Sequence, residues 1–276
     1  MQQCFYMSGL RFCKPPVAGS NPVTSFIKDI EAIARAVGAG ERRDQANKNE
    51  CAQKVKMPVL TIEALCSEAA RFSAAESRHP EPLLYGVTDG KAVGTYLEQK
   101  FRAYLSLRYA FVEGNSASGI DFPELLVDMK ATSIKQPQSS CPFKSARQKI
   151  FGLGYSLLIF VYDKTDNSTN RTATLNILRA IYVNAERTAD FQMSRGIRNI
   201  LENEGNKDDL IAFMLDRNLP VDEIMVANIA DEILRNPPIQ GFLTISNALQ
   251  WRLQYGRAIE RAGQEEGVIA VYSANP

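Results

Sequence analysis

Two carboxylates and a lysine stand close together in the segment GIDFPELLVDMK, residues 119–130. The second half of this segment is apolar and rich in β-forming residues, so it predicts a strand. Because side chains alternate between the two faces of a strand, Asp128 and Lys130 share one face. The bend after Asp121 brings a second carboxylate toward Asp128. This combination predicts a site for a hard divalent cation, since Mg²⁺ binds one or two carboxylates and completes its shell with water and phosphate oxygens.

The chemistry expected of such a site is hydrolysis of a phosphate ester. A bound metal ion generates a nucleophilic hydroxide and stabilises the departing oxygen. Lys130 could hold the attacking water and the charge that develops on phosphorus. The alternative is a surface Asp–Lys pair on an edge strand, where charges discourage aggregation.

The order Asp121, then Asp128-x-Lys130, on a hairpin resembles the PD-(D/E)XK nucleases. The continuation DMKATSIKQPQSS is similar to type II restriction endonucleases, and the resemblance extends roughly from Asp89 to Lys164. It implies an α/β fold with a restriction-endonuclease-like core, in which helices flank a mixed central sheet. It also implies that Asp121 and Asp128 bind Mg²⁺. Ile120 stands where the family has proline, so either Asp121 or Glu124 could supply the first carboxylate.

A helix is predicted from about residue 91 to 109, capped by Thr88 or Asp89, because its apolar residues recur at helical spacing. In the nucleases that the chain resembles, a glutamate on this helix often joins the metal site, and Glu98 is the candidate here. The alternative for Glu98 is an ion pair with Arg102, four residues later on the same helix. Both interpretations stay open.

After the hairpin, a polar loop leads to a predicted helix over residues 142–151, followed by the apolar run 155–162. Such a run predicts a strand buried on both faces, and a parallel pairing with the strand before it would make a right-handed crossover. The resemblance implies that polar residues of the helix approach the scissile phosphate, although a solvated helix face explains them equally well. The DNA-contact candidates in this region are Lys135, Gln138, Lys144, Arg147 and Gln148.

The chain after a predicted strand at 172–183 and a helix from Thr188 is interpreted as a C-terminal helical subdomain. It contains three amphipathic helices, at 208–218, 221–236 and from Ser246 to Gly263, and a closing strand at 267–272. The third helix suggests a helix-turn-helix-like reader, since arginine suits guanine and glutamine suits adenine. Helices packed for stability or for a dimer interface are an equally good explanation. The polar residues displayed by this helix are Gln250, Arg252, Gln254, Arg257 and Arg261.

Composition excludes several classes of protein. The single histidine, His79, excludes HNH nucleases and sites with two histidine ligands, and five cysteines without ligand spacing argue against a zinc site or a disulfide framework. The net charge of +1 excludes a strongly basic DNA-coating protein but allows a local basic cleft. No apolar run is long enough to span a membrane. The five cysteines are expected to be free thiols in a reducing cytoplasm.

Three regions are expected: an N-terminal extension (1–56), a nuclease core (57–190) and the helical C-terminal region (191–276), the last for DNA recognition or dimerisation. The extension contains Gly19-Ser20-Asn21-Pro22, which is what the T-arm of a tRNA gene encodes when read as protein. We therefore expect the true translation start to lie downstream, as late as Met57.

The sequence thus predicts a Mg²⁺-dependent type II restriction endonuclease that cleaves double-stranded DNA at specific sites in host defence. A two-fold homodimer is the simplest reader of a palindrome, and a cognate DNA methyltransferase gene is expected nearby. Two alternatives remain: a repair or junction-resolving nuclease of the same fold, and a non-catalytic DNA-binding protein.

Overall fold

The computed structural model describes residues 57–114, 119–141, 144–246 and 251–274. The expected N-terminal extension and Gln250 lie outside these residues. The helices are α2 (Ile62–Glu76), α3 (Gly90–Ser106), α4 (Arg147–Phe151), α5 (Phe191–Glu202), α6 (Lys207–Asp216), α7 (Glu223–Arg235) and α8 (Gly256–Arg261). The strands are β1 (Pro80–Glu81), β2 (Val127–Ser133), β3 (Gln138–Cys141), β4 (Ser156–Asn167), β5 (Thr172–Val183), β6 (Thr244–Ile245), β7 (Trp251–Gln254) and β8 (Val268–Ser273).

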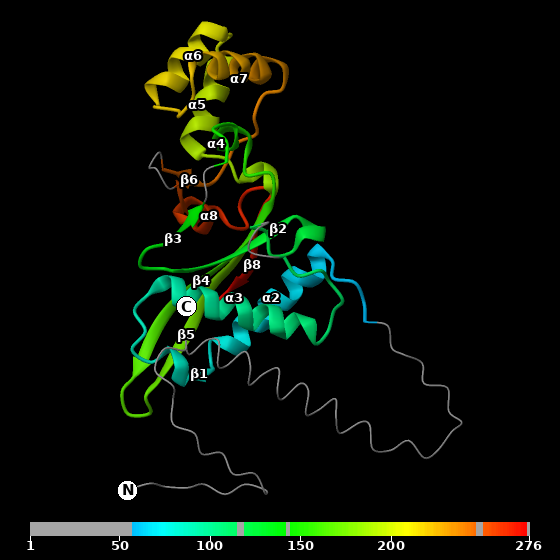
Figure 1. Cartoon of the computed structure of the whole chain (residues 1–276), viewed down its shortest axis with the longest axis vertical. Helices are drawn as coiled ribbons and strands as arrows, with labels where there is room; N and C mark the ends of the chain where they lie inside the picture. The colour runs from blue at the N-terminus through cyan, green and yellow to red at the C-terminus, as the bar shows by residue number, and fades with distance from the viewer. Residues whose placement is uncertain (1–56, 115–118, 142–143, 247–250, 275–276) are drawn as a thin grey trace, which may run out of the picture. The chain divides into compact units, whose positions relative to one another are not determined.

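A mixed central sheet has the strand order β1-β5-β4-β2, and β8 pairs with β5 (Figure 1). β2 and β4 are parallel, as expected for strands joined by a crossover, whereas β4 and β5 form a long antiparallel pair. The predicted closing strand at 267–272 is confirmed as β8. The result is a mixed α/β fold in which β2 ends the order of the central sheet.

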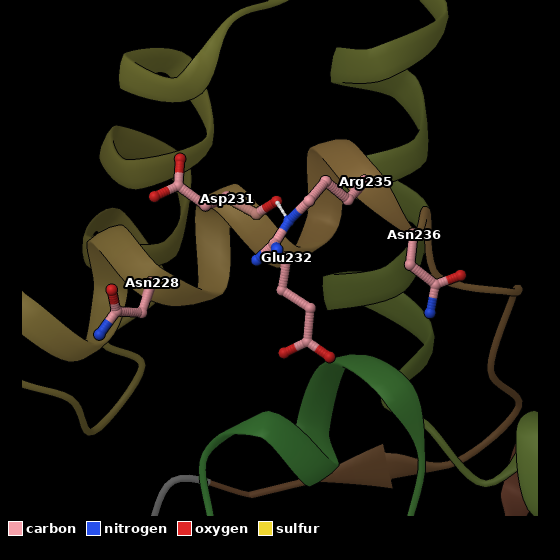
Figure 2. Close-up of a pocket in the computed structure, with 5 residues that line it drawn as sticks. All are labelled: Asn228, Asp231, Glu232, Arg235 and Asn236. Carbon is pink, nitrogen blue, oxygen red and sulfur yellow. Dashed lines mark hydrogen bonds between the residues drawn. The ribbon is translucent and has the colours of Figure 1, made fainter.

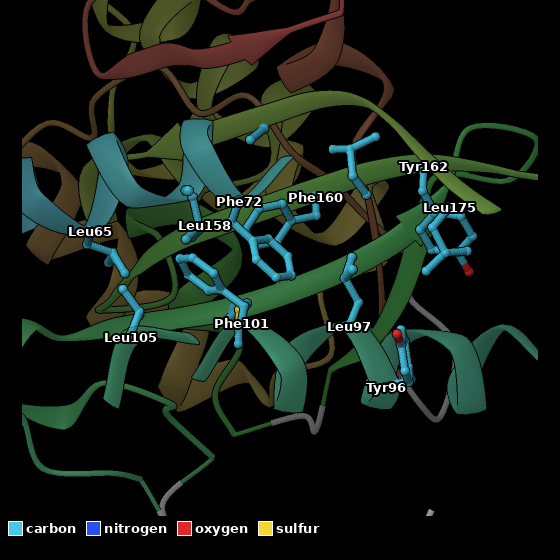
Figure 3. Packing of buried hydrophobic residues seen from close by; sticks show 14 of the residues in the cluster. Leu65, Phe72, Tyr96, Leu97, Phe101, Leu105, Leu158, Phe160, Tyr162 and Leu175 are labelled. Atoms are coloured by element: carbon cyan, nitrogen blue, oxygen red, sulfur yellow. The ribbon is translucent and has the colours of Figure 1, made fainter. Parts of the chain in front are cut away.

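Helices α2 and α3 cover one face of the sheet, as Figure 3 shows. Phe101 of α3 lies between Phe72 of α2 and Phe160 of β4, with ring centroids 5.0 and 5.1 Å apart. Asp89 accepts hydrogen bonds from the first backbone N–H groups of α3, which confirms one of the two predicted caps. The helix that precedes the hairpin at residues 121–130 is therefore fixed by an apolar stripe and an N-terminal cap.

The other face of the sheet packs against a second, three-stranded antiparallel sheet of order β3-β7-β6 and against α8. Leu157, Ile159 and Val161 of β4 lie on this side, whereas the residues between them face α2 and α3. The prediction that this strand is buried on both faces is confirmed. Asp128 and Lys130 are in register with Leu157 and Ile159, so their side chains lie on the side of the second sheet.

The predicted helix from Ser246 to Gly263 is wrong. Residues 251–254 form strand β7, and α8 begins only at Gly256. The side chains alternate, with Trp251 and Leu253 buried and Arg252 and Gln254 exposed, which is the period of a strand. The sequence WRLQ did not identify this strand, because all four residue types also occur in helices.

The other two C-terminal helices are confirmed as α6 and α7, and they share an apolar core with α4 and α5. Figure 1 shows these four helices gathered together. The N-termini of α5, α6 and α7 are capped by the side chains of Asp190, Asn206 and Asp222. In the described part of the chain, no helix combines the length and the apolar character needed to cross a membrane.

Candidate active site

The Asp-x-Lys pair lies on β2, where both side chains point toward the second sheet. Lys130 Nζ lies 2.6 Å from Asp128 Oδ2, and both side chains are largely shielded from solvent. In the parallel ladder, the neighbouring positions on β4 are apolar and buried. A charged pair in this environment is unusual for a surface strand, where charges normally face water. The geometry therefore favours a functional pair over the surface alternative.

Two further carboxylates occupy the outer edge of β2. Asp121 Oδ2 accepts a hydrogen bond of 2.8 Å from the backbone N–H of Met129. Glu98 accepts a hydrogen bond from the backbone of Ala131. Met129 and Ala131 are two residues apart, so their N–H groups point to the same edge. Two carboxylates from different elements thus bind the strand that carries Asp128 and Lys130.

Gly94 lets helix α3 come close enough to β2 for this contact. A Cβ atom at position 94 would lie 3.3 Å from the carbonyl oxygen of Ala131, which is tighter than nearly all real contacts. Glu98 follows one helical turn later, on the same side of α3, and reaches the backbone of that same residue. The missing side chain of Gly94 therefore positions Glu98 at the strand edge.

The pKa values of Asp128, Glu98 and Lys130 are all raised, because the two carboxyl groups are buried and the lysine lies close to carboxylates. The pKa of Asp128 is raised to about 7, mainly by burial and also by the nearby carboxyl of Asp121, while Lys130 opposes both effects. Burial likewise raises the pKa of Glu98 to about 7, with smaller upward contributions from Asp121 and Asp128. Interaction with Asp128, Glu98 and Asp121 raises the pKa of Lys130, against the effect of burial. Three carboxyl groups thus lie close together beside the ammonium of Lys130 and the guanidinium of Arg102, and a divalent cation would relieve the mutual repulsion of the carboxylates.

Arg102 and Glu124, both considered in the sequence analysis, make contacts other than those with Glu98 or the cation. Arg102 pairs with Asp121, at 3.3 Å, and not with Glu98 as the alternative interpretation had it. Glu124 lies on the short 3₁₀ turn Pro123–Leu125 and accepts a hydrogen bond of 3.3 Å from the backbone N–H of Val112. The structure thus brings Asp121 and Glu98 to the Asp128 strand and directs Glu124 to a neighbouring loop.

The donor set fits a cation that keeps much of its water. Among the described residues, no three His, Cys, Asp or Glu side chains are arranged as a ready-made metal cage. The carboxyl groups of Asp121 and Asp128 are, however, within hydrogen-bonding reach of each other. Mg²⁺ is normally held by one or two carboxylates plus water and phosphate oxygens, so two adjacent carboxylates are sufficient.

The candidate DNA-contact residues are scattered, and several already have protein partners. Lys135 pairs with Asp163, Arg147 with Glu232, and Gln148 donates to the carbonyl oxygen of Leu153. The guanidinium of Arg257 lies 3.9 Å from the ring centre of Phe191. Gln138 lies on β3 and Arg252 on β7, while Lys144 and Arg252 are exposed. The structure brings Gln138 and Arg252 into one sheet, which the sequence did not predict.

A hollow of about 580 Å³ lies on helix α7, lined by Asn228, Asp231, Glu232, Arg235 and Asn236 (Figure 2). Within it, Arg235 Nε donates a hydrogen bond of 3.1 Å to the carbonyl oxygen of Asp231. No residue of β2 or α3 lines it, and Glu232 is engaged by Arg147. This hollow is therefore separate from the carboxylate site on β2.

Sequence reasoning missed two residues beside the site. Thr132, two residues after Lys130, bonds through its hydroxyl to both the backbone N–H and the carbonyl oxygen of Gln138. Tyr255 is fully buried, its hydroxyl lies 2.5 Å from Ser139 Oγ, and the charge of Asp128 contributes to its raised pKa. Only one sequence signal could have found Thr132: it follows Lys130 by two residues, so its side chain shares the face of β2 that carries Asp128 and Lys130.

Comparisons with known proteins show the family of the chain. The family described as type II restriction enzyme NspV matches residues 59–270, about three quarters of the chain. The type II restriction enzyme NspV from Nostoc sp. is 84% identical over 220 residues, which cover 80% of this chain and 100% of that protein. No solved structure matches the chain. The chain belongs to the NspV family of type II restriction enzymes.

Proposed function

We propose that this type II restriction enzyme hydrolyses phosphodiester bonds of double-stranded DNA with Mg²⁺ held by Asp121 and Asp128, on a PD-(D/E)XK core. The observation that supports the proposal is the placement of Asp121, Asp128 and Glu98 around the free edge of one strand, with Lys130 between them. Type II restriction enzymes generally use a divalent metal ion, and the all-oxygen donor set is that of a hard cation.

Each residue has a distinct part in the reaction. Mg²⁺, when bound, would lower the pKa of a water molecule and stabilise the departing oxygen. Asp121 and Asp128 hold the cation, and their ties to β2 keep them from separating. Lys130 donates hydrogen bonds to the attacking water and to the phosphate oxygens, where negative charge builds up. Glu98 completes the site by accepting a hydrogen bond from a metal-bound water or by binding the cation directly.

Lys130 forms an ion pair with Asp128, with Nζ 2.6 Å from Oδ2. A cation held by Asp128 would share the charge of this carboxylate and leave the ammonium of Lys130 available to the substrate. The positive charge of Lys130 is maintained throughout, because three carboxylates surround it and raise its pKa. A charged lysine suits a role as a positioning and electrostatic group better than a role as a neutral base.

DNA approaches the site from the side of the second sheet, because Asp128 and Lys130 point there. Exposed Lys144 is proposed to contact backbone phosphates, as are Lys135 and Arg147 when DNA competes with Asp163 and Glu232 for them. Gln148, Gln250 and Arg257 remain proposed contacts of the same kind. Cutting both strands of a palindrome is most simply done by a two-fold homodimer, and a partner methyltransferase would protect the host DNA in the cytoplasm.

The test is cleavage of unmethylated phage DNA by purified protein with Mg²⁺, with parallel reactions in EDTA, in Ca²⁺ and without added metal. Discrete fragments with one common end sequence, lost in EDTA, are expected. Smeared products would instead indicate a non-specific repair or junction nuclease. Fragments that persist in EDTA would contradict the metal-dependent mechanism. Sedimentation with a cognate duplex would test the dimer, which predicts two chains per site.

A further inference from the structure

The second sheet has two faces of opposite character. In its ladder Ser139, Leu253 and Ile245 share one row and face the apolar core, as do Cys141 and Trp251. The rows between them point outward, and none of their side chains is buried. In these rows Gln138 stands opposite Gln254, Gln254 opposite Thr244, and Ser140 opposite Arg252.

The chemistry of the outward face is that of a surface that reads bases. It displays two amides, two hydroxyls and a guanidinium, and no carboxylate that would repel DNA. Arginine donates two hydrogen bonds to guanine, and glutamine makes a matching pair with adenine. The major groove is wide enough to admit a two-stranded β-ribbon, and β3 with β7 forms one. Arg252 and Gln254 are the most exposed of the long side chains.

The outward face is joined directly to the strand that carries Asp128 and Lys130. The hydroxyl of Thr132, on the same face of β2, accepts a hydrogen bond of 3.0 Å from Gln138 N and donates one of 3.2 Å to Gln138 O. The backbone N–H of Tyr255, next to Gln254, donates to the carbonyl oxygen of Pro137 at 2.9 Å. A duplex with a phosphate at Lys130 would therefore place nearby base pairs against this sheet.

The sheet is also held rigidly enough to discriminate between bases. The buried carboxylate of Asp190 accepts a hydrogen bond of 2.7 Å from Ile245 N and also caps helix α5. Ser246 and Arg252 exchange two hydrogen bonds of 3.1 Å, from Ser246 N to Arg252 O and from Arg252 N to Ser246 Oγ. Base readout needs side chains on such fixed elements, because a shift of about 1 Å removes a bidentate contact.

We propose that the outward face of the β3-β7-β6 sheet reads the recognition sequence in the major groove, with Arg252 and Gln254 as specificity-determining residues. The inference rests on the proposed endonuclease function. It replaces the recognition helix that the sequence suggested with a small antiparallel sheet.

The experiment first identifies the recognition sequence by sequencing the fragment ends that the wild-type enzyme produces. Cleavage is then measured on a panel of duplexes in which each base pair of the site is replaced in turn. The variants are Arg252→Ala, Arg252→Lys and Gln254→Ala, with Arg78→Ala and Gln264→Ala as controls at exposed positions outside this sheet. Thermal unfolding confirms that each variant folds.

Arg252→Ala should lower kcat/KM on the cognate duplex by about 5- to 150-fold, the range for one lost bidentate contact. Discrimination should collapse at one G·C pair and its symmetry mate, and persist at the other positions. Gln254→Ala should do the same at an A·T pair. Arg252→Lys should also lose discrimination while keeping the salt dependence of binding, since lysine retains the charge but not the paired donors.

If Arg252→Ala lowered cleavage equally on every duplex of the panel, or if Arg252→Lys restored wild-type discrimination, base reading by Arg252 would be overturned. Arg252 would then be a phosphate contact. Unchanged discrimination in all three variants would also overturn it. If the wild-type enzyme cuts no DNA, the proposed function fails. A preferred duplex is then selected from random duplexes by wild-type binding in Ca²⁺, and the single-pair replacements of that duplex, measured by equilibrium binding, decide the inference alone, by whether Arg252→Ala loses preference at single positions.

Discussion

Lys130 Nζ and Asp128 Oδ2 lie 2.6 Å apart on one face of strand β2, shielded from solvent. The pair stands in register with buried apolar residues of β4, so two charges occupy positions where a core would otherwise continue. Removing charges from water is costly unless they are paired or bind a cation. An interrupted core at the edge of the sheet is therefore consistent with a site shaped for a metal ion and a phosphate.

Replacing Lys130 by methionine should abolish most of the cleavage but keep metal binding. Methionine preserves the length of the side chain and removes the charge that faces the phosphate. Loss of one preorganised group of this kind lowers the rate on the order of 10²- to 10³-fold. Single-turnover cleavage rates test this, and Mn²⁺ binding measured alongside should be unchanged or tighter, because Asp128 loses a competitor. Lys91→Met, on an exposed residue of α3, is the matched control. An active Lys130→Met enzyme would contradict the role.

Replacing Glu98 by glutamine should stabilise the metal-free protein above neutral pH. The folded protein has the pKa of Glu98 raised from the ordinary value of 4.5 to about 7, so it binds more protons than the unfolded chain between these values. Stability contributed by this group is therefore lost as pH rises through that window. At pH 8 the difference is about 3.5 kcal/mol, since the two pKa values differ by about 2.5 and each pKa unit corresponds to about 1.4 kcal/mol.

Urea unfolding in EDTA from pH 4.5 to pH 8 measures the effect of Glu98→Gln directly. The wild type should lose stability relative to the variant as pH rises, and the gap should close when Mg²⁺ is added. A constant difference across the pH range would show that Glu98 is not perturbed by its surroundings. Cleavage by Glu98→Gln should fall, because the variant lacks the carboxylate that is proposed to assist the cation.

Substituting valine for Gly94 should reduce cleavage indirectly, by displacing Glu98, because Gly94 itself is not proposed to bind the cation or the DNA. A Cβ at this position already meets the Ala131 carbonyl at 3.3 Å, so a branched side chain must push α3 away from β2. Overpacking of this kind costs about 1–3 kcal/mol, and it should carry Glu98 off the strand edge and reduce cleavage. Gly90→Ala is the matched control, because a Cβ there has no neighbour within 4 Å. Equal activity of the two variants would contradict the positioning role of Gly94.

Strand β2 and its flanking helix were predictable because local patterns specify them. The alternation through Asp128 and Lys130 gave the strand and its faces, and the apolar stripe with the Asp89 cap gave helix α3. The apolar run at 155–162 gave β4 because a strand buried on both faces needs no polar positions. These signals lie within one element and do not depend on distant residues.

The second sheet could not be predicted, because its strands are short and distant in sequence. β3 pairs with β7, more than 100 residues later, and four residues such as Trp251 to Gln254 carry too few positions to distinguish a strand from a helix. The partners of Arg102 and Glu124 also come from other parts of the chain. The alternative for Arg102 was an ion pair with Glu98 on the same helix, yet Arg102 pairs with Asp121, and Glu124 accepts from the backbone of Val112. These features depend on contacts between elements that are distant in sequence, which local sequence patterns do not reveal.

The most direct test of the proposed metal site compares Asp128→Asn, Asp121→Asn and Glu124→Gln in one assay of cleavage and Mg²⁺-dependent binding. All three changes remove one carboxylate charge from the same hairpin, but Glu124 points to the backbone N–H of Val112 and away from β2. The proposed mechanism predicts that the two aspartate variants fold, bind DNA and cut it at least 10³-fold more slowly. It predicts that Glu124→Gln cuts at close to the wild-type rate. Normal cleavage by Asp128→Asn, or loss confined to Glu124→Gln, would contradict the site.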